Sequence, residues 1–487
     1  MNDVKQSMIR NSIFNVIKTI GTFLFPVINF SYISRIFGAD GMGRINFARS
    51  IVGIFAMISM LGIRYYGIRE CAKRRDDKEA LSRIFCELLL LNLIFTLLSY
   101  VLLFVYLHMS VKADGYKAEI GLYCFTILLG VISVEWLFTA VEDYLYLAKR
   151  SIVIQLFSLL AVLLLVRKKE DLYLYIIIQV VASCVVNCSG LIYIKKYLSF
   201  TRPRMTGLAV HLRPILKLFL ITMFVQVFTE MDTVMLGYLS GDTQVGLYSS
   251  AYKVSVVLCS FISSVTTVIM PRMAYLFQNE DKSKADELLK NAVQFILLVG
   301  IPLSAGACIY SRHFILLLSG EGFAGAIPAS MLLSLRTLLS PVNGMLLMHY
   351  MVPRNKEREA VIVTAVTAVF NVSLNLLLIP LLGATGAALS TVGSEMTEMI
   401  CIMAAVRKYL DIKNVFEKMY QYLVCVIPVA AAAFLAGQYI RNTVLSIVIG
   451  VVAAAPVYFI LLYNMKNRYL IRGMTVIREM LKRKVQG

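Results

Sequence analysis

The stretch FGADGMGRINFARS, residues 37–50, holds Gly38, Gly41 and Gly43 between two long apolar segments. A phosphate-binding loop of the Walker type has the pattern GxxxxGK[ST] between a strand and a helix. The chain contains no Gly-Lys dipeptide, so it lacks an ATP-binding loop of this type. Glycine instead permits positive φ angles and a close approach of neighbouring helices. We therefore predict that this stretch is a tight hairpin between two membrane helices.

The composition indicates a membrane protein. Of the 487 residues, 59% are hydrophobic and 16% are charged, and the mean hydropathy is +0.75. Soluble proteins have roughly 45–50% apolar and about 25% charged residues. A helix that spans a bilayer needs about 20 mostly apolar residues, and every backbone polar group within lipid must be bonded internally. We therefore predict an all-α polytopic membrane protein.

Apolar segments recur along the whole chain and predict about 14 transmembrane helices. The fifth segment is the shortest and gives the weakest signal. The segments lie at residues 12–36, 46–66, 84–107, 119–141, 152–166, 172–194, 215–237, 247–271, 291–316, 327–351, 360–382, 386–406, 419–438 and 444–463.

Positive charges are distributed unevenly between the loops. With the N-terminus in the cytoplasm, and with cations near span ends counted in the adjoining loops, 35 of the 48 lysines and arginines fall in inner segments, 9 in outer segments and 4 inside spans. Cytoplasmic loops of membrane proteins carry such an excess of positive charge. We therefore expect a multi-pass protein of the plasma membrane with both termini in the cytoplasm. The same asymmetry explains the net charge of +19 without a nucleic-acid partner.

An internal repeat indicates two lobes. RIFGADGMGRINFARS at 35–50 and GYLSGDTQVGLYSSAYK at 237–253 share the order apolar, Gly, Asp, Gly, then small and aromatic residues and a cation. An alignment with a one-residue gap places Arg49 opposite Lys253. Inverted or parallel repeats of this kind are common in transporters. We predict two pseudo-symmetric six-helix lobes and two extra C-terminal helices, divided as 1–200 (helices 1–6), 201–418 (helices 7–12), 419–463 (helices 13 and 14) and a basic cytoplasmic tail at 464–487.

Ionisable residues at membrane depth are costly, so they usually face a cavity or a partner. Four cations lie inside predicted spans, and we predict that they bind an anionic, phosphate-bearing substrate in a central cavity: Lys18, Arg49, Lys253 and Arg336. Three acids at similar depth are candidates for ion coupling or for a structural role: Asp232, Glu395 and Glu398. The alternative is that these groups only pair with one another, as Asp232 and Lys253 in adjacent spans would.

No metal or cofactor site is predicted. The nine cysteines lie in or beside apolar stretches without a CxxC pair, and the four histidines are scattered. Free cysteines in such places are usually small buried residues. No catalytic residues are predicted, and we expect a protein that is not an enzyme.

Several stretches together resemble the oligosaccharide flippases, which translocate repeat units of O-antigen, capsule and exopolysaccharide. The resemblance covers predicted spans 1–12 and is weak at 419–487. It is carried by residues 11–51, GIRECAKRRDDKEALSRIF (67–85), EWLFTAVEDYLYLAKRS (135–151), MDTVMLGYLSGDTQVGLYSSAYKV (231–254) and NLLLIPLLGATGAALSTVGSE (375–395).

These flippases belong to the multidrug/oligosaccharidyl-lipid/polysaccharide exporter superfamily. The resemblance implies a MATE-like fold, alternating access and a location in the bacterial plasma (inner) membrane. The implied substrate is a polyprenyl-diphosphate-linked oligosaccharide that moves from the inner to the outer leaflet for surface polysaccharide assembly. Membrane lipids and polysaccharide polymerase machinery are the implied partners. Lys18, Arg49 and Lys253 lie in spans where relatives place cavity cations, whereas Arg336 is a candidate because of its depth in the membrane.

Three alternatives remain at this stage. A cation or drug antiporter of the same superfamily would use unpaired acids such as Asp232, Glu395 and Glu398. A polymerase or glycosyltransferase would need a large outer loop or an acidic metal-binding motif, and the sequence predicts neither. A non-catalytic assembly partner would leave lipid-linked glycan transport unchanged when the gene is absent.

Overall fold

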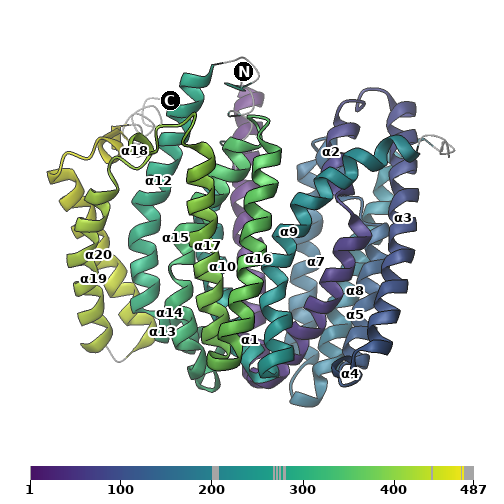
Figure 1. Ribbon diagram of the computed structural model, residues 1–487, viewed down its shortest axis with the longest axis horizontal. Helices are drawn as coiled ribbons and strands as arrows, with labels where there is room; N and C mark the ends of the chain where they lie inside the picture. The colour runs from purple at the N-terminus through teal and green to yellow at the C-terminus, as the bar shows by residue number, and fades with distance from the viewer. Residues whose placement is uncertain are drawn as a thin grey trace. The chain divides into compact units, whose positions relative to one another are not determined.

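The computed structural model describes residues 2–199, 208–266, 269, 273, 276, 277, 281–439, 442–472, 474 and 475. Side chains are not described for residues 2–23, 144, 217, 218, 221, 222, 228 and 264–266. Helices make up most of the described chain, which contains no strand (Figure 1). The predicted all-α class is therefore confirmed.

The chain divides into two compact units, Met1–Gly246 and Leu247–Gly487. The described helices of the first unit are α1 (Asn2–Met60), α2 (Ile63–Ala72), α3 (Lys78–Met109), α4 (Val111–Asp114), α5 (Lys117–Val131), α6 (Glu135–Ala140), α7 (Tyr144–Leu165), α8 (Leu172–Tyr193) and α9 (Leu208–Ser240). Helix α10 (Asp242–Thr266) begins in this unit and continues into the second.

The second unit contains both long and short helices. They are α12 (Lys282–Ile309), α13 (Ser311–Ser319), α14 (Ile327–Leu333), α15 (Arg336–Leu346), α16 (Glu357–Leu382), α17 (Ala384–Val406), α18 (Ile412–Val415), α19 (Met419–Tyr439) and α20 (Thr443–Asn464). A π-helical turn, Leu347–Met351, follows α15. Helices α16 and α17 form one antiparallel pair, and α19 and α20 form another (Figure 1).

Within the described residues, eleven helices are long and apolar enough to cross a membrane, or twelve if one bent pair forms a single span. The predicted count of fourteen is therefore not confirmed. Two predicted spans, 12–36 and 46–66, lie on either side of a kink at Gly38 within α1. Another, 215–237, lies inside α9, where several side chains are not described.

One predicted span, 327–351, is broken. Helices Glu321–Leu333 and Arg336–Met351 meet at a bend of 45°. Pro341 inside α15 has no backbone N–H, and the hydroxyl of Ser304 donates a 2.7 Å hydrogen bond to the carbonyl of Ser334 at the bend. The Ser334 carbonyl also accepts a 3.1 Å hydrogen bond from the Thr337 backbone N–H, so it is bonded within the protein at the bend, as a membrane interior requires.

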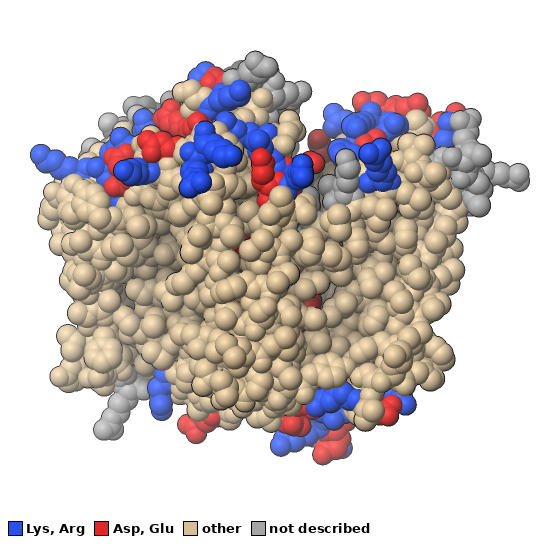
Figure 2. All heavy atoms as spheres, viewed as in Figure 1, with Lys and Arg blue, Asp and Glu red and all other residues tan. Residues whose placement is uncertain are grey.

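Charged side chains gather near the helix ends, and the surface band between them is largely uncharged (Figure 2). Exposed large apolar residues such as Leu97, Phe157 and Leu377 cover the sides of the helices. In water such a surface would be unfavourable, whereas lipid tails solvate it well. The fold is therefore that of a multi-pass membrane protein.

Candidate functional site

The hairpin at residues 37–50 forms as predicted, with a turn at Gly38. This glycine has φ of 67° and ψ of −175°, a conformation that only glycine adopts readily. The following Arg44 donates hydrogen bonds of 3.0 and 2.6 Å to Glu119 and one of 2.8 Å to the carbonyl of Gly115. Its guanidinium also lies 4.9 Å from the ring centre of Tyr116. Arg44 thus holds the hairpin against α5.

The two halves of the internal repeat contact each other through their glycines. A methyl group on Gly43 would overlap the backbone carbonyl of Asp242, and one on Gly246 would overlap the backbone carbonyl of Ala39. Gly38 and Gly241 both have positive φ. The same number of residues separates Gly38 from Gly241 and Gly43 from Gly246. We call the contact of residues 39 and 43 with residues 242 and 246 the glycine contact.

Aromatic side chains surround the glycine contact. Phe47 lies 4.7 Å from Tyr116 and 5.7 Å from Tyr238, measured between ring centres. The hydroxyl of Tyr116 donates a hydrogen bond to the carboxylate of Asp242. Gly237 leaves room for the ring of Phe47, which is fully buried. This end of the first unit is therefore tightly packed, and it has no space for a larger side chain at Gly43 or Gly237.

Arg49 lies further along α1 and is exposed. Its charge interacts with the hydroxyls of Tyr123 and Tyr175, and Tyr175 accepts a 3.3 Å hydrogen bond from Asn29. In the part of the chain that the structure describes, Arg49 itself makes no hydrogen bond or ion pair. An arginine with free donors at membrane depth is suited to an anionic ligand.

Arg336 has a different environment from Arg49. It is 9% exposed, and its Nε lies 3.3 Å from Oε1 of Glu395, which is 2% exposed. Asn343 Nδ2 donates hydrogen bonds of 2.9 Å to Glu395 Oε2 and 3.3 Å to Glu398 Oε2. The structure therefore brings together three of the predicted residues, Arg336, Glu395 and Glu398. We call these three residues with Asn343 the carboxylate cluster.

The other predicted residues are Lys18, Asp232 and Lys253. Lys18 lies in α1, and its side chain is outside the described residues. Asp232 is 1% exposed and Lys253 is partly buried, and neither lacks a partner. Their predicted pairing with each other, and their roles in transport, stay predictions. The described residues contain no group of three or more His, Cys, Asp or Glu placed to hold a metal ion.

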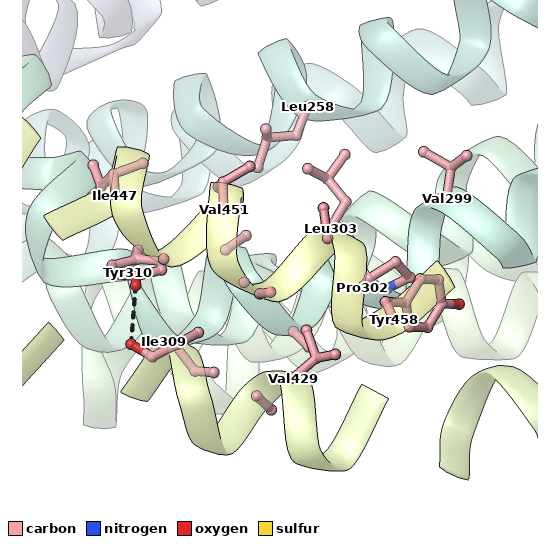
Figure 3. Close-up of a pocket in the computed structure, with 18 of the residues that line it drawn as sticks. Leu258, Val299, Pro302, Leu303, Ile309, Tyr310, Val429, Ile447, Val451 and Tyr458 are labelled. Carbon is pink, nitrogen blue, oxygen red and sulfur yellow. Dashed lines mark hydrogen bonds between the residues drawn. The ribbon is translucent and has the colours of Figure 1, made fainter. Parts of the chain in front are cut away.

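An apolar groove lies in the second unit between α12, α13, α19 and α20. It has a volume of about 240 Å³, and its lining includes Leu303, Tyr310, Val429, Val451 and Tyr458 (Figure 3). The hydroxyl of Tyr310 is occupied by a 2.9 Å hydrogen bond to the carbonyl of Ala433. The groove has no charged lining residue, so it is suited to a hydrocarbon chain.

Sequence analysis alone did not identify Asn343 or the residues of this groove. Asn343 follows Pro341 in a predicted span, and a buried amide at membrane depth is the signal that marks it. The groove residues are mostly Leu, Val, Ala and Gly, and nothing in their order distinguishes a groove from a core or a lipid-facing surface.

Comparisons with known proteins agree with this architecture. A family model described as "Polysaccharide biosynthesis protein" matches residues 8–277, and a model described as MatE matches residues 214–381. A protein of Escherichia coli (strain K12) named "Putative O-antigen transporter" is 20% identical over 397 residues. The match covers 81% of this chain and 95% of the relative.

Two solved structures share the fold. "Lipid II flippase MurJ, inward closed conformation" has a TM-score of 0.76 at 13% identity, over 94% of this chain and 99% of that chain. An outward-facing multidrug resistance MATE family transporter of the MOP superfamily has a TM-score of 0.60 at 15% identity, over 83% and 95%. The family match extends over more than half of the chain. The chain therefore belongs to the polysaccharide biosynthesis protein family, within the multidrug/oligosaccharidyl-lipid/polysaccharide exporter superfamily.

Proposed function

We propose that the protein is a flippase for polyprenyl-diphosphate-linked oligosaccharide repeat units. It moves them from the inner to the outer leaflet of the bacterial plasma membrane for surface polysaccharide assembly, by alternating access and without catalysing a reaction. The observation that carries this proposal is the charge-free groove between α12, α13, α19 and α20, because a polyprenyl tail needs an apolar surface throughout transport. The O-antigen transporter and lipid II flippase among the similar proteins support it.

We propose that the diphosphate is bound by Lys18, Arg49 and Lys253. Arg49 carries most of this argument, because it is exposed and has no hydrogen-bond or ion-pair partner among the described residues. A guanidinium binds phosphate through paired N–H donors, and such charge-assisted bonds are the strong ones. Arg336 is occupied by Glu395, so we assign it to the carboxylate cluster and not to the substrate.

The membrane potential favours transport in this direction. Moving one charge through 100 mV changes the free energy by about 2.3 kcal/mol. A diphosphate carries two negative charges, so its departure from a negative interior is favourable by roughly twice that amount. Potential alone can therefore drive export, with consumption of the glycan outside as a further pull. Membrane lipids and polysaccharide polymerase machinery are the proposed partners.

The proposal is tested by lipid extraction from a strain that lacks the gene, followed by mass analysis of polyprenyl-diphosphate glycans. We expect one complete repeat unit to accumulate and surface polysaccharide to disappear. Re-expression of the wild-type chain should reverse both effects. An unchanged lipid pool with intact polysaccharide, in a strain without a second flippase, would refute the proposal.

The second candidate function is cation or drug antiport. The MatE match at residues 214–381 favours it, since this stretch includes α15 and nearly all of α16, two helices of the second unit with buried polar groups. Expression in a drug-sensitive host separates the two candidates. Protection against toxic organic cations would support antiport, whereas the flippase proposal predicts no protection.

The groove gives a prediction with a closely matched control. Val451 lines the groove and Val452 does not, although both are exposed residues on α20. We expect Val451→Trp to fill the groove and to lower glycan export several-fold, while Val452→Trp leaves export near the wild-type rate. Export is measured as the ratio of surface polysaccharide to the lipid-linked pool, with both variants at equal amounts in the membrane. Equal export by the two variants would mean that the groove does not hold the tail.

A further inference from the structure

The carboxylate cluster holds two acids and one cation inside the second unit. Glu395 and Glu398 lie one turn apart on α17, so their side chains share a face. One Asn343 amide reaches both carboxylates, at 2.9 Å and 3.3 Å. Arg336 lies 3.3 Å from Glu395. Its single positive charge can balance only one of the two carboxylates.

Glu398 makes no ion pair with a cation in the described chain, and Lys253, which lies beside Tyr252 on α10, has a partner. The titratable groups that interact with this acid or with Arg336 include Glu395, Cys401, Tyr248, Tyr252 and Cys259. None of these five carries a positive charge. Two carboxylates that share a poorly hydrated site with one cation do not both stay ionised, because their charges repel and burial disfavours the charged form. One carboxylate therefore has to be neutral, and neutrality requires a proton.

Asn343 carries a buried acceptor that is available to a protonated carboxyl group. It is 3% exposed, and its Oδ1 has no hydrogen-bond partner among the described residues. An amide group carries both donors and an acceptor, so Asn343 can form a hydrogen bond with a neighbouring carboxyl group whether that group is ionised or protonated. Its Nδ2 donates to a carboxylate, and after a half-turn of the amide its Oδ1 accepts from a carboxylic acid. The unsatisfied acceptor is what a protonated carboxyl would use.

The position in the fold connects this proton to movement. Arg336 is the first residue of α15 after the 45° bend, and Asn343 lies two turns further along the same broken span. Coupling ions in transporters typically bind where a membrane helix is interrupted. A change in charge at such a break alters the balance between two arrangements of the helix.

We propose that the carboxylate cluster is a site for one exchangeable proton, carried by Glu398 and coupled to transport. Glu395 keeps its negative charge because it faces Arg336, whereas Glu398 makes no ion pair in the described chain and is the less buried of the two acids. In the step, the Glu398 carboxylate takes one proton from water to become a neutral carboxylic acid, and it later returns that proton. The proposal that Glu398 binds a proton does not depend on the proposed flippase function. The proposal that this proton is coupled to transport rests on that function.

Proton binding is tested on the full chain, purified and reconstituted in lipid, by infrared difference spectra recorded across neutral pH. We expect the wild type to show the carbonyl band of one carboxylic acid that titrates. Glu398→Gln should lose this band, and Glu398→Asp should keep it with a shifted frequency. Glu119→Gln is the control, because Glu119 is buried with an arginine of its own, Arg44 at 2.6 Å, and the band should persist in it. Absence of the band from the wild type, or its survival in Glu398→Gln, would overturn the site.

Coupling is tested in the strain that lacks the gene, with each variant expressed to the same membrane level. We expect Glu398→Gln to accumulate lipid-linked glycan, and Glu398→Asp to restore export. Export by Glu398→Gln at the wild-type rate, together with loss of the infrared band, would refute coupling while leaving the flippase function intact. If wild-type protein itself restores no export, the flippase proposal fails and coupling falls with it, while the infrared result still decides the proton site.

Discussion

Replacement of Arg49 and Lys253 by alanine is expected to abolish glycan export while leaving the amount of protein in the membrane unchanged. Hydrogen bonds to charged groups contribute about 1.5–3 kcal/mol each. A diphosphate that loses its cations therefore loses several such bonds at a depth where water cannot replace them. Arg49 is exposed and makes no hydrogen bond or ion pair within the described chain, so its removal should leave the fold intact.

Single variants show which part of this effect comes from Arg49. Arg49→Ala should accumulate lipid-linked glycan, and Arg49→Lys should retain partial export, because lysine keeps the charge and loses the paired donors. Arg312→Ala is the control, since Arg312 is also an exposed arginine but belongs to no proposed binding site. The measurement is the lipid-linked pool by mass analysis. Full export in the double variant would refute a cationic binding site for the diphosphate.

Gly43→Ala is expected to have the second-largest effect. The added methyl group would overlap the carbonyl of Asp242, which is backbone and cannot rotate away. Overpacking of this kind typically costs about 1–3 kcal/mol, which reduces the population of the state with the glycine contact by about 5- to 150-fold. If the contact closes and opens during transport, a shift of this size should lower export strongly.

The direct readout is hydrogen exchange of the backbone amides at 39–44 and 242–246. We expect faster exchange in both segments of Gly43→Ala and little change elsewhere. Gly121→Ala is the control, because a methyl group on Gly121 would meet no atom within 4 Å. Exchange at the wild-type rate in Gly43→Ala would show that the contact does not control the opening of this end.

Hydropathy predicted the all-helical membrane fold, and the glycines predicted the hairpin at 37–50. Both are local properties: apolar length identifies a span, and a positive φ at Gly38 needs glycine. The number of spans differs, because the described chain has eleven or twelve candidate spans where hydropathy predicts about 14. The predicted span 327–351 reads as one apolar stretch, but the chain bends between Leu333 and Arg336. Hydropathy is averaged over a window of about 19 residues, so it does not detect such a break.

Depth in the membrane singled out Arg49, Arg336, Glu395 and Glu398, but it did not separate their surroundings. Arg336 and Glu395 are 59 positions apart in sequence and meet only because α15 and α17 pack together. Arg49 has no such neighbour in the described chain. The difference depends on the register between helices, which hydropathy does not specify.

The glycine contact also bears on how the chain evolved. Each half gives one carbonyl and one glycine, which is the arrangement of two identical subunits around a two-fold axis. The repeats then align without a gap, and the position of Arg49 is taken by Tyr252 in the second repeat, beside Arg336. Duplication and fusion of one gene would produce this symmetry. It is retained at the contact itself, whereas the positions beyond the contact have diverged, as Arg49 and Tyr252 show.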